Sequence, residues 1–253
     1  MKREVVADRS ELAAAWLRQY ERLAQTFADV LGKKNRKIAE IGCGSGQLTI
    51  PLAKHVANVQ FVLVDRYAGS AYSQNYEALL SNLKKAKLIG RARVAVSDYL
   101  KWIATQGDGM YDAVISSEFL PEIDSADTRR FIKECYRMVR SGGVTAHSFL
   151  SPVPRNSGQR LLIMADSNPI WTKTPPKEWF SPEPALVTSE LRKSGFHGIR
   201  KTAIRSYLIM KADAARCWLK AGEVKASFYE KHKTQLNKDG LEVPDWIVVS
   251  GIK

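Results

Sequence analysis

The stretch IAEIGCGSGQLT, at residues 38–49, decides the fold of this chain. Its apolar first half predicts a buried strand, which runs directly into Gly42, Gly44 and Gly46, and a helix is expected just after them. Glycine has no Cβ and tolerates positive φ. A ligand can therefore lie almost against the backbone of this turn, near the N–H groups that open the helix.

The next apolar run, VQFVLVD, ends in Asp65, nineteen positions after Gly46 (65 − 46). A carboxylate at the end of the second strand of such a unit can accept hydrogen bonds from both hydroxyls of a ribose. The glycine turn and the acidic strand end together predict a site for a ligand that contains a nucleoside.

Strand-like and helix-like segments alternate through the rest of the chain, which indicates βαβ units and a parallel sheet. The expected strands are residues 37–42, 59–65, 92–98, 111–120, 144–150, 199–207 and 246–252. The expected helices are residues 48–56, 72–88, 125–140, 183–194 and 211–238, with a short one within 158–166. Ser181 and Pro182 are expected to begin the helix over 183–194. Residues 151–184 hold seven of the ten prolines, so we expect an irregular excursion there.

A further helix is expected before the glycine turn, over residues 10–32. Apolar side chains recur there at spacings of three and four, which gives one apolar stripe. That stripe is Leu12, Trp16, Tyr20, Leu23 and Phe27. Ser10 is expected to cap the start of this helix, and Gly32 its end.

The composition restricts the class of protein. The chain has 253 residues, 45% of them hydrophobic, and a net charge of +13 that is spread along the sequence. This excess fits solvated faces and helix ends, or alternatively a surface for RNA. No apolar run approaches the roughly 20 residues of a membrane span, and the first residues lack the pattern of a secretory signal. We therefore expect a cytoplasmic protein. Cys43, Cys135 and Cys217 lie far apart in the sequence, so we expect neither a disulfide framework nor a structural zinc site.

The spacing of the glycines separates two nucleoside-binding families. A dinucleotide fingerprint reads GxGxxG, whereas this chain reads GxGxG with Glu40 two positions before the first glycine. That pattern resembles motif I of the class I S-adenosylmethionine-dependent methyltransferases. Four later segments resemble the family's landmarks in the same order: the strand-end Asp65, the acidic loop SDY, the fourth strand YDAVISSEFL and the segment RMVRSGGVTAHSF. KSGF with the strand that follows it, and the terminal WIVVSGIK, resemble strands six and seven of the family.

The resemblance implies a Rossmann-like sheet of seven strands, mostly parallel with the last strand antiparallel and placed between the fifth and sixth, and helices on both faces. It implies an N-terminal helical cap over residues 1–34 and a methyltransferase domain over 35–253, with the excursion at 151–184 and a helical insertion at 208–243. The implied cofactor is S-adenosylmethionine, released as S-adenosylhomocysteine, with no metal. The residues that the resemblance assigns to the cofactor are Glu40, Gly42, Cys43, Gly44, Gly46, Asp65, Arg66, Ser97, Asp98, Tyr99 and Ser116.

On the acceptor side, Glu118 follows the fourth strand, where the family's methyl acceptor lies. It can act as a base or orient a cationic amine, or it is simply a solvated loop acid. His147 is read first as a core histidine and second as a base. The acceptor pocket can be lined by Trp171, Trp179, Phe180 and Tyr207, although plain core or lid packing is the first interpretation of each residue alone. Ala214, Trp218, Ala221 and Phe228 form a rough stripe that can cover the acceptor or a second subunit.

Several acceptors are disfavoured. SSEF replaces the Asn-Pro-Pro-Tyr type of motif after the fourth strand, which argues against the exocyclic amino groups of nucleobases. No cysteine near the fourth or fifth strand is placed to attack a pyrimidine. We therefore expect a small-molecule acceptor, with RNA or a protein side chain as alternatives. A nicotinamide-dependent oxidoreductase and a non-catalytic nucleoside-binding protein are the other interpretations, and the sequence leaves a monomer and a homodimer both open.

Overall fold

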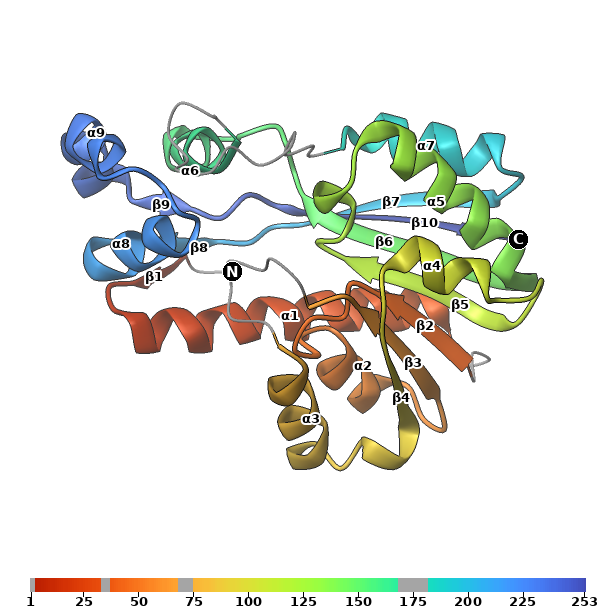
Figure 1. Cartoon of the computed structure of the whole chain (residues 1–253). Helices are drawn as coiled ribbons and strands as arrows, with labels where there is room; N and C mark the ends of the chain where they lie inside the picture. Colours follow the sequence, from red (N-terminus) through yellow and green to blue (C-terminus); the bar gives the residue numbers. More distant parts are fainter. Residues whose placement is uncertain (1–2, 33–36, 68–74, 168–181) are drawn as a thin grey trace.

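The computed structural model describes residues 3–32, 37–67, 75–167 and 182–253. Two sheets lie within these residues, and they form a large α/β unit and a smaller lobe at one end of it (Figure 1). None of the helices described here is both long and apolar enough to cross a lipid bilayer.

The large sheet has seven strands in the order β4-β3-β2-β5-β6-β10-β7. Their bounds are β2 Lys37–Ile41, β3 Gln60–Asp65, β4 Ala92–Val96, β5 Tyr111–Ser117, β6 Val139–Leu150, β7 His197–Ile204 and β10 Trp246–Ile252. The pairs from β4 to β6 are parallel, whereas β10 is antiparallel to both β6 and β7. The expected Rossmann-like sheet, with its last strand reversed between the fifth and sixth, is thereby confirmed.

Helices cover both faces of this sheet, which explains why the central strands are continuously apolar. The first face is covered by α1 Arg9–Leu31, α2 Thr49–His55 and α3 Tyr76–Lys85. The second face is covered by α4 Tyr99–Ala104, α5 Ser125–Met138 and α7 Pro184–Lys193. Short 3₁₀ turns lie at Ile89–Arg91 and Leu120–Glu122.

The smaller lobe has a core of its own that the sequence analysis does not predict. A three-stranded sheet joins β1 Glu4–Val6, β8 Leu208–Met210 and β9 Leu241–Glu242. It packs with α6 Ser157–Ser167, α8 Ala212–Ala221 and α9 Ala226–Asp239. The segment expected as a purely helical insertion, 208–243, thus begins and ends with strands, and α1 extends alongside both units (Figure 1).

Two predicted helix starts are wrong. Helix α1 begins at Arg9, and its N-cap is Asp8, whose carboxylate accepts the amide of Glu11 at 2.9 Å. Ser10 lies inside the helix and instead donates to Asp8. Helix α7 has Pro184 in its first turn, after Glu183. Ser181 lies outside the described residues. The expected end at Gly32 is confirmed, because its amide bonds to the carbonyl of Ala28.

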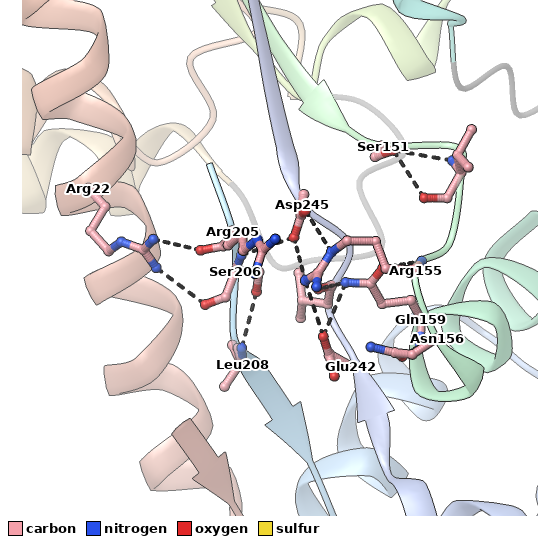
Figure 2. Close-up of polar contacts among 12 residues, drawn as sticks. Arg22, Ser151, Arg155, Asn156, Gln159, Arg205, Ser206, Leu208, Glu242 and Asp245 are labelled. Carbon is pink, nitrogen blue, oxygen red and sulfur yellow. Dashed lines mark hydrogen bonds and ion pairs between the residues drawn. The ribbon is translucent and has the colours of Figure 1, made fainter. Parts of the chain in front are cut away.

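Polar side chains form hydrogen bonds and ion pairs with the two segments that connect the large sheet to the smaller lobe, one after β7 and one before β10 (Figure 2). Arg22 of α1 donates to the carbonyls of Arg205 and Ser206, just after β7. Asp245, just before β10, accepts from the guanidinium of Arg155 at 2.7–2.8 Å and from the amide of Ser206. Arg155 also reaches Glu242 of β9 at 3.4 Å. This network fixes the lobe against the carboxyl edge of the sheet.

Candidate functional site

The glycine turn between β2 and α2 has the backbone conformation that the sequence analysis requires. Gly42, Gly44 and Gly46 have φ values of +73°, +49° and +84°, a region that L side chains rarely adopt. A Cβ on Gly42 would lie 3.0 Å from the side chain of Phe119. The turn therefore needs glycine both for its dihedral angles and for the close approach of the segment after β5.

The strand-end acid Asp65 lies directly beside this turn. Its Oδ2 accepts the amide of Gly44 at 2.9 Å, and its Oδ1 accepts the amide of Tyr67 at 2.8 Å. The amides of Gly42 and Cys43 both donate to the carbonyl of Val64, one residue earlier. Because β2 and β3 are parallel neighbours, the glycine turn and Asp65 lie together at the carboxyl edge of the sheet.

Glu40 lies behind the turn as a buried carboxyl that accepts the hydroxyl of Thr49 on α2. Burial raises the pKa of Glu40 to about 8, and the hydrogen bond from Thr49 only partly opposes this. This pair joins β2 to the start of α2. We interpret Glu40 as a support of the turn.

Tyr67 contacts the same turn, and the sequence analysis did not single it out. Its hydroxyl donates to the carbonyl of Gly44 at 3.2 Å and lies 3.5 Å from the sulfur of Cys43. Cys43 is buried, and burial raises the pKa of its thiol. The only available signal was an aromatic residue two positions after the strand-end acid. Arg66 between them is exposed; burial raises the pKa of Glu122, and the charge of Arg66 partly opposes this.

The acidic loop after β4 joins the same edge, because the amide of Ser97 bonds to the carbonyl of Asp65 at 3.0 Å. Asp98 caps α4 by accepting the amides of Leu100 and Lys101. The ring of Tyr99 packs edge-on against Phe119 at 5.0 Å. Ser97, Asp98 and Tyr99 therefore lie at the same edge of the sheet as Asp65, and Tyr99 contacts Phe119 there.

Ser116 and His147 form a buried pair inside the sheet. The hydroxyl of Ser116 lies 2.9 Å from Nδ1 of His147, and Nε2 of His147 lies 2.9 Å from the hydroxyl of Thr145. Burial lowers the pKa of His147 to about 3, so the ring is neutral at neutral pH. The first interpretation of His147, a core histidine, is confirmed. The side chain of Ser116 is committed to this pair, which leaves only its backbone for any ligand.

Glu118 follows β5 with an unusual backbone, because its φ is +54°. Its amide donates to the carbonyl of Ser148, and this bond holds the turn against β6. Its Oε1 is buried and has no hydrogen-bond partner among the described residues. Burial raises the pKa of Glu118 to about 8, a hydrogen bond from the backbone of Leu150 opposes this, and Asp166 is among the acids that raise it further. Glu118 is thus a largely buried acid rather than a solvated loop residue.

Aromatic rings surround this edge of the sheet. Trp16 of α1 lies 5.0 Å from Trp218 of α8 and 5.8 Å from Trp246, measured between ring centroids. Tyr20 lies 5.4 Å from Trp246, and Ser117 hydrogen-bonds to its hydroxyl. Of the predicted lining residues, Trp171, Trp179 and Phe180 lie outside the described residues, and Tyr207 contacts Arg22 instead.

The stripe expected on the insertion divides in two. Ala214 and Phe228 are fully buried in the core of the smaller lobe, whereas Trp218 contacts the N-terminal helix through Trp16. Asp166 of α6, which the sequence analysis missed, lies beside Trp218. Burial raises the pKa of Asp166 to about 7. The proline-rich sequence around α6 contains no pattern that singles out Asp166.

The basic excess gathers partly in a groove of about 790 Å³ along α5 and α7. Its cations are Arg129, Arg130, Lys133, Arg137, Lys193 and Lys253. Glu190 pairs with Arg129 and Lys193, and Glu134 pairs with Arg137. None of the predicted cofactor residues lines this groove. In the part of the chain that the structure describes, no group of three or more metal-ligating side chains occurs.

Comparison with a family of known sequences gives a match over the central part of the chain. Residues 38–143 match a family model described as a methyltransferase domain. Over 153 residues the chain is 26% identical to a ubiquinone biosynthesis O-methyltransferase of Cronobacter sakazakii, which covers 60% of this chain and 56% of that protein. The chain spans about half the length of the curated relatives that it matches.

Solved structures share the fold at low sequence identity. An S-adenosylmethionine-dependent methyltransferase from Archaeoglobus fulgidus superposes with a TM-score of 0.60 at 15% identity, and the match covers 94% of each chain. A phosphoethanolamine N-methyltransferase 2 from Haemonchus contortus, solved in complex with S-adenosylmethionine, gives a TM-score of 0.57 at 16% identity. That match covers 92% of this chain and 52% of the other.

Proposed function

Because residues 38–143 match a family model described as a methyltransferase domain, we propose that the chain is an S-adenosylmethionine-dependent methyltransferase that methylates a small-molecule acceptor. The observation that carries this proposal is the hydrogen bond between the amide of Gly44 and the carboxylate of Asp65. It joins a glycine-rich turn to an acid at the carboxyl edge of a doubly wound sheet, where ligands of such sheets bind.

The residues at this edge fit an adenosyl cofactor. Each oxygen of Asp65 accepts one backbone amide, and a carboxylate oxygen has room for a second donor such as a ribose hydroxyl. Gly42, Gly44 and Gly46 carry no side chains, and their positive φ values set the path of the turn beside Asp65. Asp98 uses one oxygen to cap α4, which leaves the other for an exocyclic amine. We assign the adenosyl part of the cofactor to Gly42, Gly44, Gly46, Asp65 and Asp98.

S-adenosylmethionine supplies an electrophilic methyl group when bound. The protein has to hold the acceptor atom in line and keep water out. Glu118 lies after β5, the strand next to β2, so its carboxyl is on the same edge as the glycine turn. Burial raises the pKa of Glu118 to about 8, so its deprotonated form is a stronger base than an ordinary carboxylate and can accept a proton from a weakly acidic acceptor. Tyr20 of α1 lies near Ser117 and Glu118 at this edge, and its ring packs against that of Trp16.

The small-molecule acceptor draws support from the curated relatives, whose printed names describe O-methyltransferases of ubiquinone biosynthesis. The RNA alternative receives less support, because the basic groove along α5 and α7 is lined by none of the cofactor residues and three acids neutralise part of it. We therefore retain the small molecule as the proposed acceptor class.

A methyl-transfer assay tests this proposal. The protein is incubated with methyl-labelled S-adenosylmethionine and either a cell metabolite extract below about 1 kDa or total RNA. Label should appear in the metabolite fraction and depend on Asp65, since the Asp65→Ala variant should give none. Label in RNA alone would show that the acceptor is RNA and not a small molecule. No label in either fraction, together with no binding of the cofactor, would contradict the proposal.

A further inference from the structure

Tyr67 forms hydrogen bonds with both halves of the candidate cofactor site. Its backbone amide donates to Oδ1 of Asp65 at 2.8 Å, and its hydroxyl donates to the carbonyl of Gly44 at 3.2 Å. The amide of Gly44 donates in turn to Oδ2 of Asp65 at 2.9 Å. Gly44, Asp65 and Tyr67 are therefore joined in a closed set of three hydrogen bonds, called the Gly44–Asp65–Tyr67 triangle below.

The backbone of Tyr67 has a conformation that is unfavourable for its residue type. Its φ is +52°, a region that bulky L residues rarely adopt. Such a conformation persists only where the surroundings hold it in place, and strained residues of this kind concentrate at ligand sites. The two hydrogen bonds of Tyr67 hold it here, and its partly buried ring packs against the core on the first face of the large sheet.

The triangle orients the carboxylate of Asp65. Each of its oxygens accepts one amide, so the carboxylate cannot rotate without losing a hydrogen bond, and each oxygen keeps room for a second donor. The hydroxyl of Tyr67 holds the carbonyl of Gly44, the residue whose amide fixes Oδ2 of Asp65. A carboxylate that is oriented before the ligand arrives binds more tightly, because less ordering is required on binding.

We infer that Tyr67 is a positioning residue, whose hydroxyl keeps Asp65 oriented for the ribose hydroxyls of the cofactor. This inference rests on the proposed function. Tyr67 acts through Gly44 and Asp65, so its loss should weaken the recognition of the ribose in particular. A role confined to the stability of the fold would instead leave the discrimination between ligands unchanged.

Calorimetry with two nucleosides tests this inference. Adenosine carries both ribose hydroxyls, and 2′-deoxyadenosine lacks one of them. The wild-type protein should prefer adenosine by at least about tenfold, since a hydrogen bond to a charged acceptor is worth that much. Tyr67→Phe removes only the hydroxyl and should lower this preference to about threefold. It should also weaken the binding of S-adenosylhomocysteine by about three- to tenfold, the worth of one hydrogen bond between neutral groups.

Two further variants separate the hydroxyl from its surroundings. Tyr67→Gly keeps the amide that bonds to Asp65 and adopts a positive φ without strain, but it lacks the hydroxyl. It should bind S-adenosylhomocysteine at least as weakly as Tyr67→Phe does, whereas wild-type affinity would overturn the inference. Tyr76→Phe is the control, because the exposed ring of Tyr76 lies 6.1 Å from that of Tyr67, and it should change neither the affinity nor the preference. Circular dichroism verifies that each variant is folded.

A double-mutant cycle tests whether Tyr67 acts through Asp65. In the Asp65→Ala background, Tyr67→Phe should weaken the binding of S-adenosylhomocysteine by less than about twofold, because the carboxylate that the hydroxyl positions is missing. An equal loss in both backgrounds would mean that Tyr67 contributes independently of Asp65, and it would overturn the inference.

The outcomes distinguish this inference from the proposed function. Failure of the wild-type protein to bind S-adenosylhomocysteine would contradict the proposed function and the inference with it. Normal binding of S-adenosylhomocysteine by the wild type, with the same affinity and the same preference for adenosine in Tyr67→Phe, would overturn the role of Tyr67 alone.

Discussion

The amide of Gly44 donates to Oδ2 of Asp65 at 2.9 Å, so the glycine turn after β2 and the acid that ends β3 hold one another in place. Neither strand alone determines this contact. It arises because β2 and β3 are adjacent and parallel, with Ile41 in register with Val64 one residue before Asp65. The contact places an acceptor of hydrogen bonds beside bare backbone, which is the arrangement that a nucleoside requires.

Gly42 should tolerate no side chain. Gly42→Ala combines a positive φ with a Cβ 3.0 Å from Phe119, so we expect a loss of about 1–3 kcal/mol in the free energy of unfolding. Affinity for S-adenosylhomocysteine should fall at least about tenfold if the turn shifts by a few tenths of an ångström. Urea unfolding and calorimetry measure these two quantities. Gly90→Ala is the control, since nothing lies within 4 Å of its Cβ position, and an equal effect of both substitutions would refute this interpretation.

Arg155 should be essential to the junction of the two units. Arg155→Met leaves the buried acids Glu242 and Asp245 without their counter-charge, which should cost about 3 kcal/mol of unfolding free energy. Hydrogen exchange should accelerate in α6 and β9 before it does so in the large sheet. Arg216→Met removes an exposed pair with Asp213 and should leave the unfolding free energy close to that of the wild-type protein. Similar losses from both variants would show that the network in Figure 2 does not fix the lobe.

Stability should depend on pH through Glu118. Its pKa is raised from 4.5 to about 8 by burial, so the folded protein retains a proton that the unfolded chain loses. The contribution is complete below pH 4.5 and is lost as the pH rises to 8. Over that window the group lowers the unfolding free energy by at most about 1.4 kcal/mol per pH unit.

Urea titrations between pH 5 and pH 8.5 measure this slope. Glu118→Gln should make the slope shallower, because glutamine does not titrate. Glu118→Asp keeps a carboxyl at the same place and should retain most of the slope. An unchanged slope in Glu118→Gln would mean that Glu118 is charged in the folded protein at neutral pH.

The large sheet could be predicted because its central strands are buried on both faces and read as continuous apolar runs, as in VQFVLVD. The glycine turn and Asp65 could be predicted because parallel strands bring their carboxyl ends to one edge. The three-stranded sheet could not, since β1 and β8 have three residues each and β9 has two. Such segments are too short for a period of two to be visible, and their pairing depends on contacts over about 200 residues.

The sequence singled out only one of the two buried carboxyls Glu118 and Asp166. Glu118 was found from its place after the fourth strand, but Asp166 lies on α6, whose flanking prolines suggested irregular structure. Its significance depends on its nearness to Trp218, fifty-two positions later (218 − 166), which no local pattern reveals. The cap at Asp8 was missed for a similar reason, because Asp8 and Ser10 are both good N-cap residues and only the backbone angles distinguish them.

The central claim is that the edge formed by Gly42, Gly44, Gly46 and Asp65 binds the adenosyl part of S-adenosylmethionine. Calorimetry of S-adenosylhomocysteine with the wild-type protein and with Asp65→Ala tests this claim most directly. The wild type should bind one equivalent, and Asp65→Ala should bind about a hundredfold more weakly, which corresponds to two lost hydrogen bonds to a charged group. Equal affinity of the two proteins, or no binding by the wild type, would contradict the account.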